Sequence, residues 1–498
     1  MAPARKLIPL LFALACAKAT PVVPDPYAYR SPPQVGVAEA IRPDTWDTHL
    51  REDLLPYWTM DAARGTPPGN FPTYRDMNGA PASPTTRKPR MLGRQIFTYS
   101  IGYLLTGDEA LLDLARAGNR WLLDHGRDTA RGGWYADLDA AGAPYLDNAK
   151  FAQDFAYTAM GPAAYFYVTA DAEAEAAVLA TRDLLFDPAR FWDAPNGRIK
   201  DGLDGALGGQ EQYMEGGGPR SWQLVAQLDP LTAFLLLVQP MLHDGARREQ
   251  ALGDLRTLAL RLHDSFWQDG IFWGATGYIG YYGTRHTDFG HTLKSYWALL
   301  QIDKRLPDHP LHDFLALNAK ATLTSAYDSP NGRWAKRPRS RTLVDFGADW
   351  WAAAEADQLA ATLALQDPSW IATVAQTSTS FRHDFVDRTR PAHELVPSVD
   401  REGHWAYPWQ DGDTAKSNEW KNGFHGTEHA LVMSLFGHWA TGTPAPLYFA
   451  FPADQISALA ARATPYTFEG HVARVEDLGA LQADPTRHKV RILFDQLH

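Results

Sequence analysis

The chain has almost no cysteine: its 498 residues contain one, Cys16, within an N-terminal segment that we expect to be removed. The remaining chain would then have no thiol for a disulfide or a thiolate metal site. Its 17 histidines are scattered, and no His-Glu-x-x-His spacing occurs. We therefore expect no metal ion.

The chain also lacks clusters of basic residues and long apolar runs. A net charge of −11 without a Lys/Arg cluster argues against nucleic acid as a partner. No internal run approaches the roughly 20 apolar residues of a membrane span. The 17 Trp, 20 Tyr and 22 Phe favour a carbohydrate ligand, because aromatic rings form flat platforms for the C–H faces of sugars. We expect a small-molecule carbohydrate as the partner, and a monomer or homodimer.

The N-terminus resembles an export signal. A short positive start precedes the apolar run Leu7–Ala15, and Ala17-Lys18-Ala19 has the small-x-small pattern of a cleavage site. The sequence predicts a signal peptide over 1–19, cleaved after Ala19, and a periplasmic or secreted protein. A lipoprotein acylated at Cys16 is the less favoured alternative, because the residue three before it is alanine rather than leucine.

Glycine marks a long-period repeat. Six times, a glycine followed by an aromatic or aliphatic residue lies in a polar loop between helical stretches, at spacings of 62 to 73 residues. Such a period predicts a closed or stacked array of similar units, each burying its apolar face on its neighbours. The six segments are Gly69-Asn70-Phe71, Gly132-Gly133-Trp134, Gly197-Arg198-Ile199, Gly270-Ile271-Phe272, Gly332-Arg333-Trp334 and Gly403-His404-Trp405.

The apolar spacing between these loops is helical, with Gly107 and Asp108 as one example of a stop signal followed by a start signal. Twelve helices in six hairpins predict an all-α (α/α)6 barrel over 45–445. A Pro-rich arm over 20–44 precedes it. An extension over 446–498 follows, with short strands near Tyr466 and Val472. The helices are expected at about 45–60, 96–104, 110–123, 149–168, 172–187, 222–241, 246–267, 291–304, 311–327, 346–365, 367–385 and 421–440.

Polar residues gather at the start of alternate helices, which we expect to be the inner ones. Buried polar groups are costly unless paired, so their recurrence at one rim predicts a pocket floor; helix capping or loop pairing is the alternative for any one of them. His291 and His425 each lie at a helix N-terminus, where the helix dipole disfavours the imidazolium form. The set is Arg94, Lys150, Gln153, Asp154, Gln223, Gln227, His291, Asp349, Glu355, His425, Glu428 and His429.

Three segments carry a family resemblance: Asp288-Phe289-Gly290-His291, the Asp349–Ala356 run beginning Asp-Trp-Trp, and Trp420-Lys421-Asn422-Gly423-Phe424-His425. In order and spacing they resemble the N-acylglucosamine 2-epimerase superfamily, especially its cellobiose 2-epimerase branch, over about 45–440. The resemblance implies an (α/α)6 barrel that acts at C2 of sugars, by epimerisation or aldose–ketose isomerisation, without an organic cofactor.

The resemblance also implies roles for single residues. His291 and His425 would be an acid/base pair that acts through a cis-enediolate, and Arg94 would stabilise the developing charge. Lys294 stands where the family usually has glutamate, and the third inner helix lacks a histidine common in this branch. The expected substrate-binding residues are Trp350, Trp351, Glu355, Asp349, Trp420, Lys150, Gln153 and Lys294.

Two other functions fit the sequence. The same barrel could host a glycoside hydrolase or polysaccharide lyase, with carboxylates from Asp349, Glu355, Glu211 or Asp154. The protein could also bind sugar without catalysis. Export favours a free reducing mono- or oligosaccharide as the substrate, because sugar phosphates and nucleotide sugars are scarce outside the cytoplasm.

Overall fold

The computed structural model describes residues 25–33, 36–214, 217–406 and 415–498. The predicted signal peptide and Cys16 lie outside these ranges. Twelve helical stretches follow one another within them. They are α1–η2–α2 (Pro43–Thr48, His49–Leu54, Leu55–Thr59), α4 (Pro89–Thr106), α5 (Glu109–His125), α6 (Ala152–Thr169), α7 (Ala172–Leu185), α8–η3–α9 (Leu224–Pro230, Leu231–Leu235, Leu236–Val238), α10 (Gly245–Phe266), α11 (Phe289–Arg305), α12 (His312–Ala326), α13 (Trp350–Ala364), α14 (Ile371–Asp384) and α15 (Phe424–Thr441).

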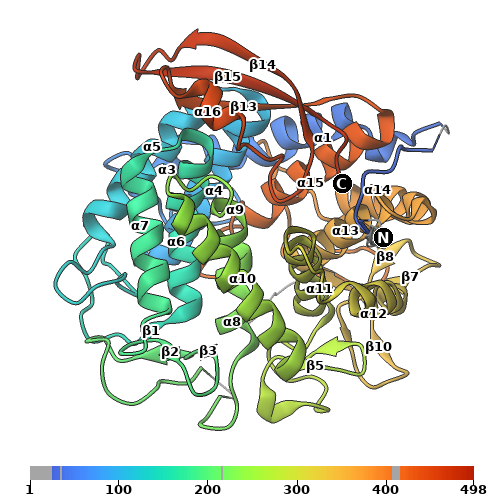
Figure 1. Ribbon diagram of the computed structural model, residues 1–498, viewed down its shortest axis with the longest axis horizontal. Helices are drawn as coiled ribbons and strands as arrows, with labels where there is room; N and C mark the ends of the chain where they lie inside the picture. The colour runs from blue at the N-terminus through green and yellow to red at the C-terminus, as the bar shows by residue number, and fades with distance from the viewer. Residues whose placement is uncertain (1–24, 34–35, 215–216, 407–414) are drawn as a thin grey trace, which may run out of the picture.

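Alternate helices form an inner ring. Helix α6 is apolar on nearly every side and is buried along its length, as expected for a helix covered all round. Helix α5 buries only the stripe that contains Leu111, Ala115 and Leu122, and turns its charged face outward. Inner helices pack in the order α4–α6–α8 and α11–α13–α15, and α15 returns to α4 (Figure 1). The predicted (α/α)6 barrel is confirmed.

The repeated glycines have a shared geometric cause. All six, from Gly69 to Gly403, adopt positive φ angles between 57° and 100°. Non-glycine residues pay a steric cost in this region because of their Cβ atom. Each lies in a tight turn of the loop end, for example between β5 (Trp267–Gln268) and β6 (Ile271–Phe272). The glycine therefore recurs once per unit because each unit contains a turn that needs a positive φ.

The C-terminal extension contains a strand at Val472, as expected, but the strand expected at Tyr466 is wrong, because Tyr466–Phe468 form a turn. The extension forms an antiparallel sheet in the order β13 (Ala445–Pro452), β15 (Arg487–Asp495), β14 (His471–Ala480), with the short helix α16 (Ile456–Ala460) after β13. β13 packs against α4 and α6. The sheet covers the barrel at the end where inner helices finish (Figure 1): the Tyr103 hydroxyl, near the end of α4, donates to Phe449 O.

Across the described ranges, none of the helices combines the length and apolarity needed to cross a bilayer.

Candidate active site

A cavity of about 520 Å³ opens where the inner helices begin, at the loop end of the barrel. It brings together nine of the eleven residues that the sequence predicts for the site. These are Arg94, Gln153, His291, Lys294, Asp349, Trp350, Trp351, Trp420 and His425. Glu355 lies beside His425, and Lys150 lies in the short strand β1 (Lys150–Phe151); neither lines the cavity.

His291 is fixed by a residue one turn before it. Asp288 is the N-cap of α11 and accepts a hydrogen bond from His291 N at 2.7 Å. Its other oxygen lies 2.9 Å from His291 Nδ1. Burial would raise the pKa of the Asp288 carboxyl, but the charge and hydrogen bonds of His291 outweigh it and lower that pKa. An ionised Asp288 takes the Nδ1 proton as its hydrogen-bond donor, which leaves Nε2 of His291 as the free base.

Trp351 lies close to both histidines. Its ring centre is 4.7 Å from that of His291 and 5.9 Å from that of His425. Gly290 makes this approach possible, because a Cβ at that position would lie 2.4 Å from the indole ring. The glycine of the Asp-Phe-Gly-His segment thus sets the spacing of the pair.

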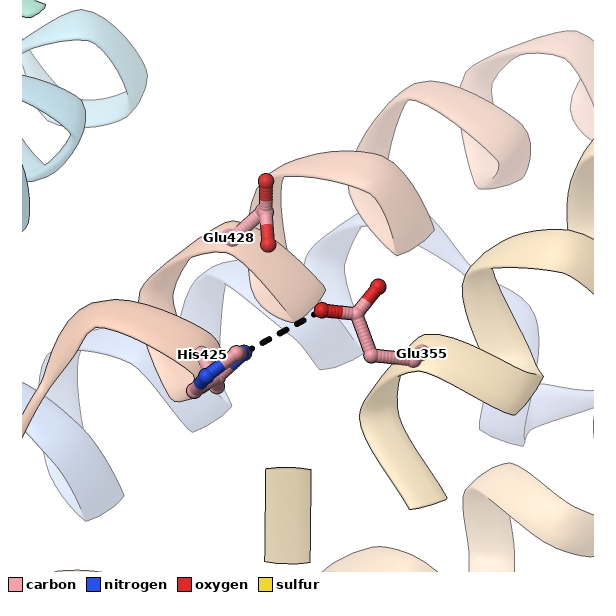
Figure 2. Close-up of side chains that lie close together, drawn as sticks. All are labelled: Glu355, His425 and Glu428. Carbon is pink, nitrogen blue, oxygen red and sulfur yellow. Dashed lines mark ion pairs between the residues drawn. The ribbon is translucent and has the colours of Figure 1, made fainter. Parts of the chain in front are cut away.

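His425 has a different environment. Its Nδ1 lies 3.3 Å from Glu355 Oε1, on the neighbouring inner helix α13 (Figure 2). Burial lowers the pKa of His425 well below its usual value, and the positive charges of Arg94 and Lys294 lower it further. His425 is therefore a neutral imidazole near pH 7.

The floor of the cavity carries two buried cations. Arg94 lies 3.7 Å over the ring of Tyr157 and donates to Trp420 O at 2.9 Å. Lys294 donates to Asp229 Oδ1 at 2.8 Å and to the Tyr157 hydroxyl at 3.0 Å. Lys294 is thus paired directly with a carboxylate, whereas Arg94 contacts a carbonyl and an aromatic ring. The guanidinium of Arg94 is the fixed positive charge suited to an anionic intermediate.

Sequence reasoning missed Asp229 and Tyr157. Asp229 holds three donors: Lys294, the Tyr157 hydroxyl at 2.9 Å and Gln153 Nε2 at 2.9 Å. The signal was a single carboxylate within the apolar run of an inner helix, Leu228-Asp229-Pro230. A buried lone acid needs a buried partner. That partner is Lys294, which the sequence assigned to substrate binding.

Other predicted residues are occupied by protein contacts. Lys150 pairs with Asp128 at 2.6 Å, and both are buried. Asp349 lies 3.1 Å from Lys336. The ring of Trp420 is covered by the guanidinium of Arg90 at 4.1 Å, so cation–π contact competes with sugar stacking there.

The carboxylates considered for hydrolysis are also engaged. Asp154 pairs with Arg90 at 2.8 Å, and Glu211 accepts two hydrogen bonds from Arg198 at 2.6 and 2.8 Å. Glu355 is buried and does not line the cavity, and Asp349 pairs with Lys336. The described residues therefore offer no pair of free carboxylates across the cavity.

Glu355, His425 and Glu428 place one ligand atom each within 4.8 Å of one another (Figure 2). That spacing would admit a metal ion. However, Glu428 accepts a hydrogen bond from Tyr466, and the charges of Arg94, Lys294 and Lys421 act on His425. A cation would be repelled by these groups, so the cluster is better suited to holding a proton.

Residues 69–214 match the model of the N-acylglucosamine 2-epimerase (GlcNAc 2-epimerase) family. Over these residues the sequence is similar to that family. Its similarity to a cellobiose 2-epimerase from Bacteroides fragilis is 32% identity over 127 residues, which are 25% of this chain and 31% of that relative. The alignment thus spans about a third of the curated relative. The resemblance inferred from the three motifs is confirmed.

Solved structures extend the likeness to the whole barrel. The cellobiose 2-epimerase of Spirochaeta thermophila superposes with a TM-score of 0.66 at 20% identity, covering 79% of this chain and 96% of that one. A D-mannose isomerase superposes with a TM-score of 0.65 at 18% identity, covering 80% and 100%. At this identity the comparison establishes the shared fold.

Proposed function

We propose that this protein is an exported sugar epimerase or isomerase that acts at C2 of a free reducing mono- or oligosaccharide. One observation carries the proposal: two histidines with separate carboxyl partners lie close to Trp351 in a single cavity. The match to the N-acylglucosamine 2-epimerase family model and the similarity to a cellobiose 2-epimerase support it.

The chemistry follows from the two imidazoles. His291 Nε2 removes the proton from C2 of the ring-opened sugar, and the electron pair moves to the carbonyl oxygen to give a cis-enediolate. Arg94 supplies fixed positive charge for that oxygen. His425 then gives a proton to the opposite face of C2, which yields the epimer, or to C1, which yields the ketose.

The alternatives receive less support. A hydrolase needs two carboxylates flanking the scissile bond, and the four candidates are paired or buried. A purely sugar-binding protein has no need of a carboxylate that fixes the tautomer of His291. The Asp288–His291 pair therefore favours proton transfer.

The test is proton NMR of the protein with reducing sugars in deuterated water. The panel contains neutral and acidic monosaccharides and disaccharides. We expect deuterium at C2 of at least one sugar, together with a new epimer or ketose. Cleavage of an oligosaccharide without C2 exchange would replace the proposal with a hydrolase or lyase, and line broadening alone would replace it with a binding protein.

A further inference from the structure

A residue of the C-terminal extension, Tyr466, contacts a buried glutamate beside the proposed active site. We infer that Tyr466, through Glu428, keeps Glu355 as a neutral carboxylic acid that donates a hydrogen bond to Nδ1 of His425. His425 then carries its own proton on Nε2, and it is the proton donor of the histidine pair. Tyr466, Glu428 and Glu355 are positioning residues in this scheme. The inference rests on the proposed function.

Tyr466 is held in an unusual conformation. It is a buried non-glycine residue with a φ of 63°, in the left-handed region that such residues rarely adopt. Its N–H donates to the Tyr167 hydroxyl at 2.9 Å, and its carbonyl accepts from Thr464 Oγ1 at 2.8 Å. Its ring stacks on Trp297, and its hydroxyl donates to Glu428 Oε1. The surrounding contacts thus maintain a strained backbone that aims one hydroxyl at one carboxylate.

The two buried glutamates have unequal partners. Glu428 accepts from Tyr466 at one oxygen and faces Gln358 Nε2 at 3.5 Å with the other. Neither oxygen of Glu355 accepts a hydrogen bond from the described residues, and its side chain is only 1% exposed. Its Oε1 lies 3.3 Å from His425 Nδ1, within reach of a proton on Glu355. A buried carboxylate without donors is far more costly than a buried carboxylic acid. The negative charge therefore belongs on Glu428, and the proton on Glu355.

The electrostatics agree with this assignment. Burial, followed by the charge of Glu428, raises the pKa of Glu355 well above its usual value. Burial also raises the pKa of Glu428, but the Tyr466 hydrogen bond acts against that rise. Lys294 lowers the pKa of both carboxyls and so does not distinguish them. The charged and titratable groups around His425 are Arg94 from α4, His291 and Lys294 from α11, Glu355 from α13, Glu428 from α15, Lys421 before α15 and, through Glu428, Tyr466.

With Glu355 as the donor, proton transfer balances. His291 takes the C2 proton and becomes an imidazolium beside Asp288. His425 gives its Nε2 proton to the enediolate carbon and receives the Glu355 proton at Nδ1, so that it stays neutral while Glu355 becomes a carboxylate. His291 then loses its extra proton to water. Water returns a proton to Nε2 of His425, and the Nδ1 proton of His425 passes back to Glu355, which restores the starting state; turnover in the reverse direction also restores it. A histidine with a strongly lowered pKa can thus act as an acid without becoming a cation.

The experiment is nitrogen NMR of the full chain labelled with ¹⁵N-histidine, recorded without substrate. Wild type is compared with Tyr466→Phe, which keeps the ring against Trp297, and with Tyr448→Phe, a control in β13 of the same extension. A spectrum of His425→Gln assigns the resonances. In wild type at pH 7 we expect His425 to carry its proton on Nε2. In Tyr466→Phe, Glu428 loses its hydrogen-bond donor and takes the proton from Glu355, so Glu355 ionises. Nδ1 of His425 then becomes protonated, and the pKa of His425 rises by about one unit or more.

Glu428→Gln is the second variant. It removes the charge that keeps Glu355 protonated, so it should move His425 in the same direction as Tyr466→Phe. A wild-type His425 with its proton on Nδ1 would overturn the inference, as would an unchanged His425 in both variants. Because the spectra need no substrate, an absence of C2 exchange with every sugar would refute the proposed function separately. In the active enzyme, Tyr466→Phe should lower kcat about tenfold with KM unchanged and shift the acid limb of the pH–rate profile upward, while Tyr448→Phe should change neither.

Discussion

His291 and His425 begin equivalent helices of the same barrel, yet their surroundings differ in kind. The carboxyl partner of His291 is Asp288, three residues earlier in the chain, and it also caps the helix. The carboxyl partner of His425 is Glu355, on another helix, and it accepts no hydrogen bond. One histidine has an ionised partner at the cavity wall, and the other has a buried partner backed by Glu428 and Tyr466.

This difference separates two ways of tuning an imidazole. A local carboxylate holds Nδ1 of His291, so its Nε2 is left to receive a proton. Burial beside Arg94 and Lys294 destabilises the protonated ring, so His425 is suited to stay neutral. A two-base reaction benefits from both, because its two groups must hold different protonation states at the same pH.

Removing either imidazole should have the largest effect. We expect His291→Ala and His425→Ala each to lower kcat for C2 exchange by about 10³-fold, in line with the loss of a general acid or base. Deuterium incorporation followed by NMR measures it. Arg341→Gln, at an exposed site that pairs with Asp269 away from the cavity, is the control. Activity retained within tenfold in either histidine variant would remove that histidine from the acid/base pair.

Replacing the local carboxylate should have a smaller effect on the His291 side. Asn is as good an N-cap as Asp, so Asp288→Asn keeps helix α11 capped but removes the charge beside Nδ1. We expect kcat to fall about 10²-fold, with the melting temperature within a few degrees of wild type. A fall in kcat that is accompanied by a large fall in melting temperature would instead make Asp288 a structural cap alone.

His286, a neighbour of His291, makes the folding stability depend on pH. Its ring lies 4.8 Å from that of His291, and burial, together with the charge of His291, lowers its pKa from 6.5 to about 3. The unfolded chain binds a proton there below about pH 6.5, whereas the folded chain does not until about pH 3. Stability from this site is therefore present above pH 6.5 and is lost as the pH falls.

His286→Asn removes this dependence, and Asn tolerates the residue's φ of 59°. Between pH 7 and pH 5 we expect the urea-unfolding free energy of wild type to fall by about 2 kcal/mol relative to the variant. Parallel curves for the two proteins over that range would contradict a neutral, buried His286.

The helical barrel could be predicted because its signals are local and repeated. Apolar spacing, caps and glycine turns recur in each unit, and the expected helix at 291–304 corresponds to α11 at Phe289–Arg305. The boundary error at the expected helix 346–365 has a tertiary cause. There, Ala348 and Asp349 pair with Val399 and Ser398, so α13 begins only at Trp350. A strand pairing with a segment some 50 residues away leaves no local trace.

The sequence by itself determined the order of helices, the glycine turns and the Asp288–His291 contact, because each depends on residues within a few positions of one another. Tertiary structure alone decided which buried charges meet. Lys294 pairs with Asp229 on another inner helix, and Glu355 on α13 contacts His425 on the neighbouring helix α15. Tyr466 contacts Glu428 from the C-terminal extension. These pairs are set by ring closure and by the sheet that covers the barrel. A single buried charge predicts that a partner exists, but only the packed fold selects it.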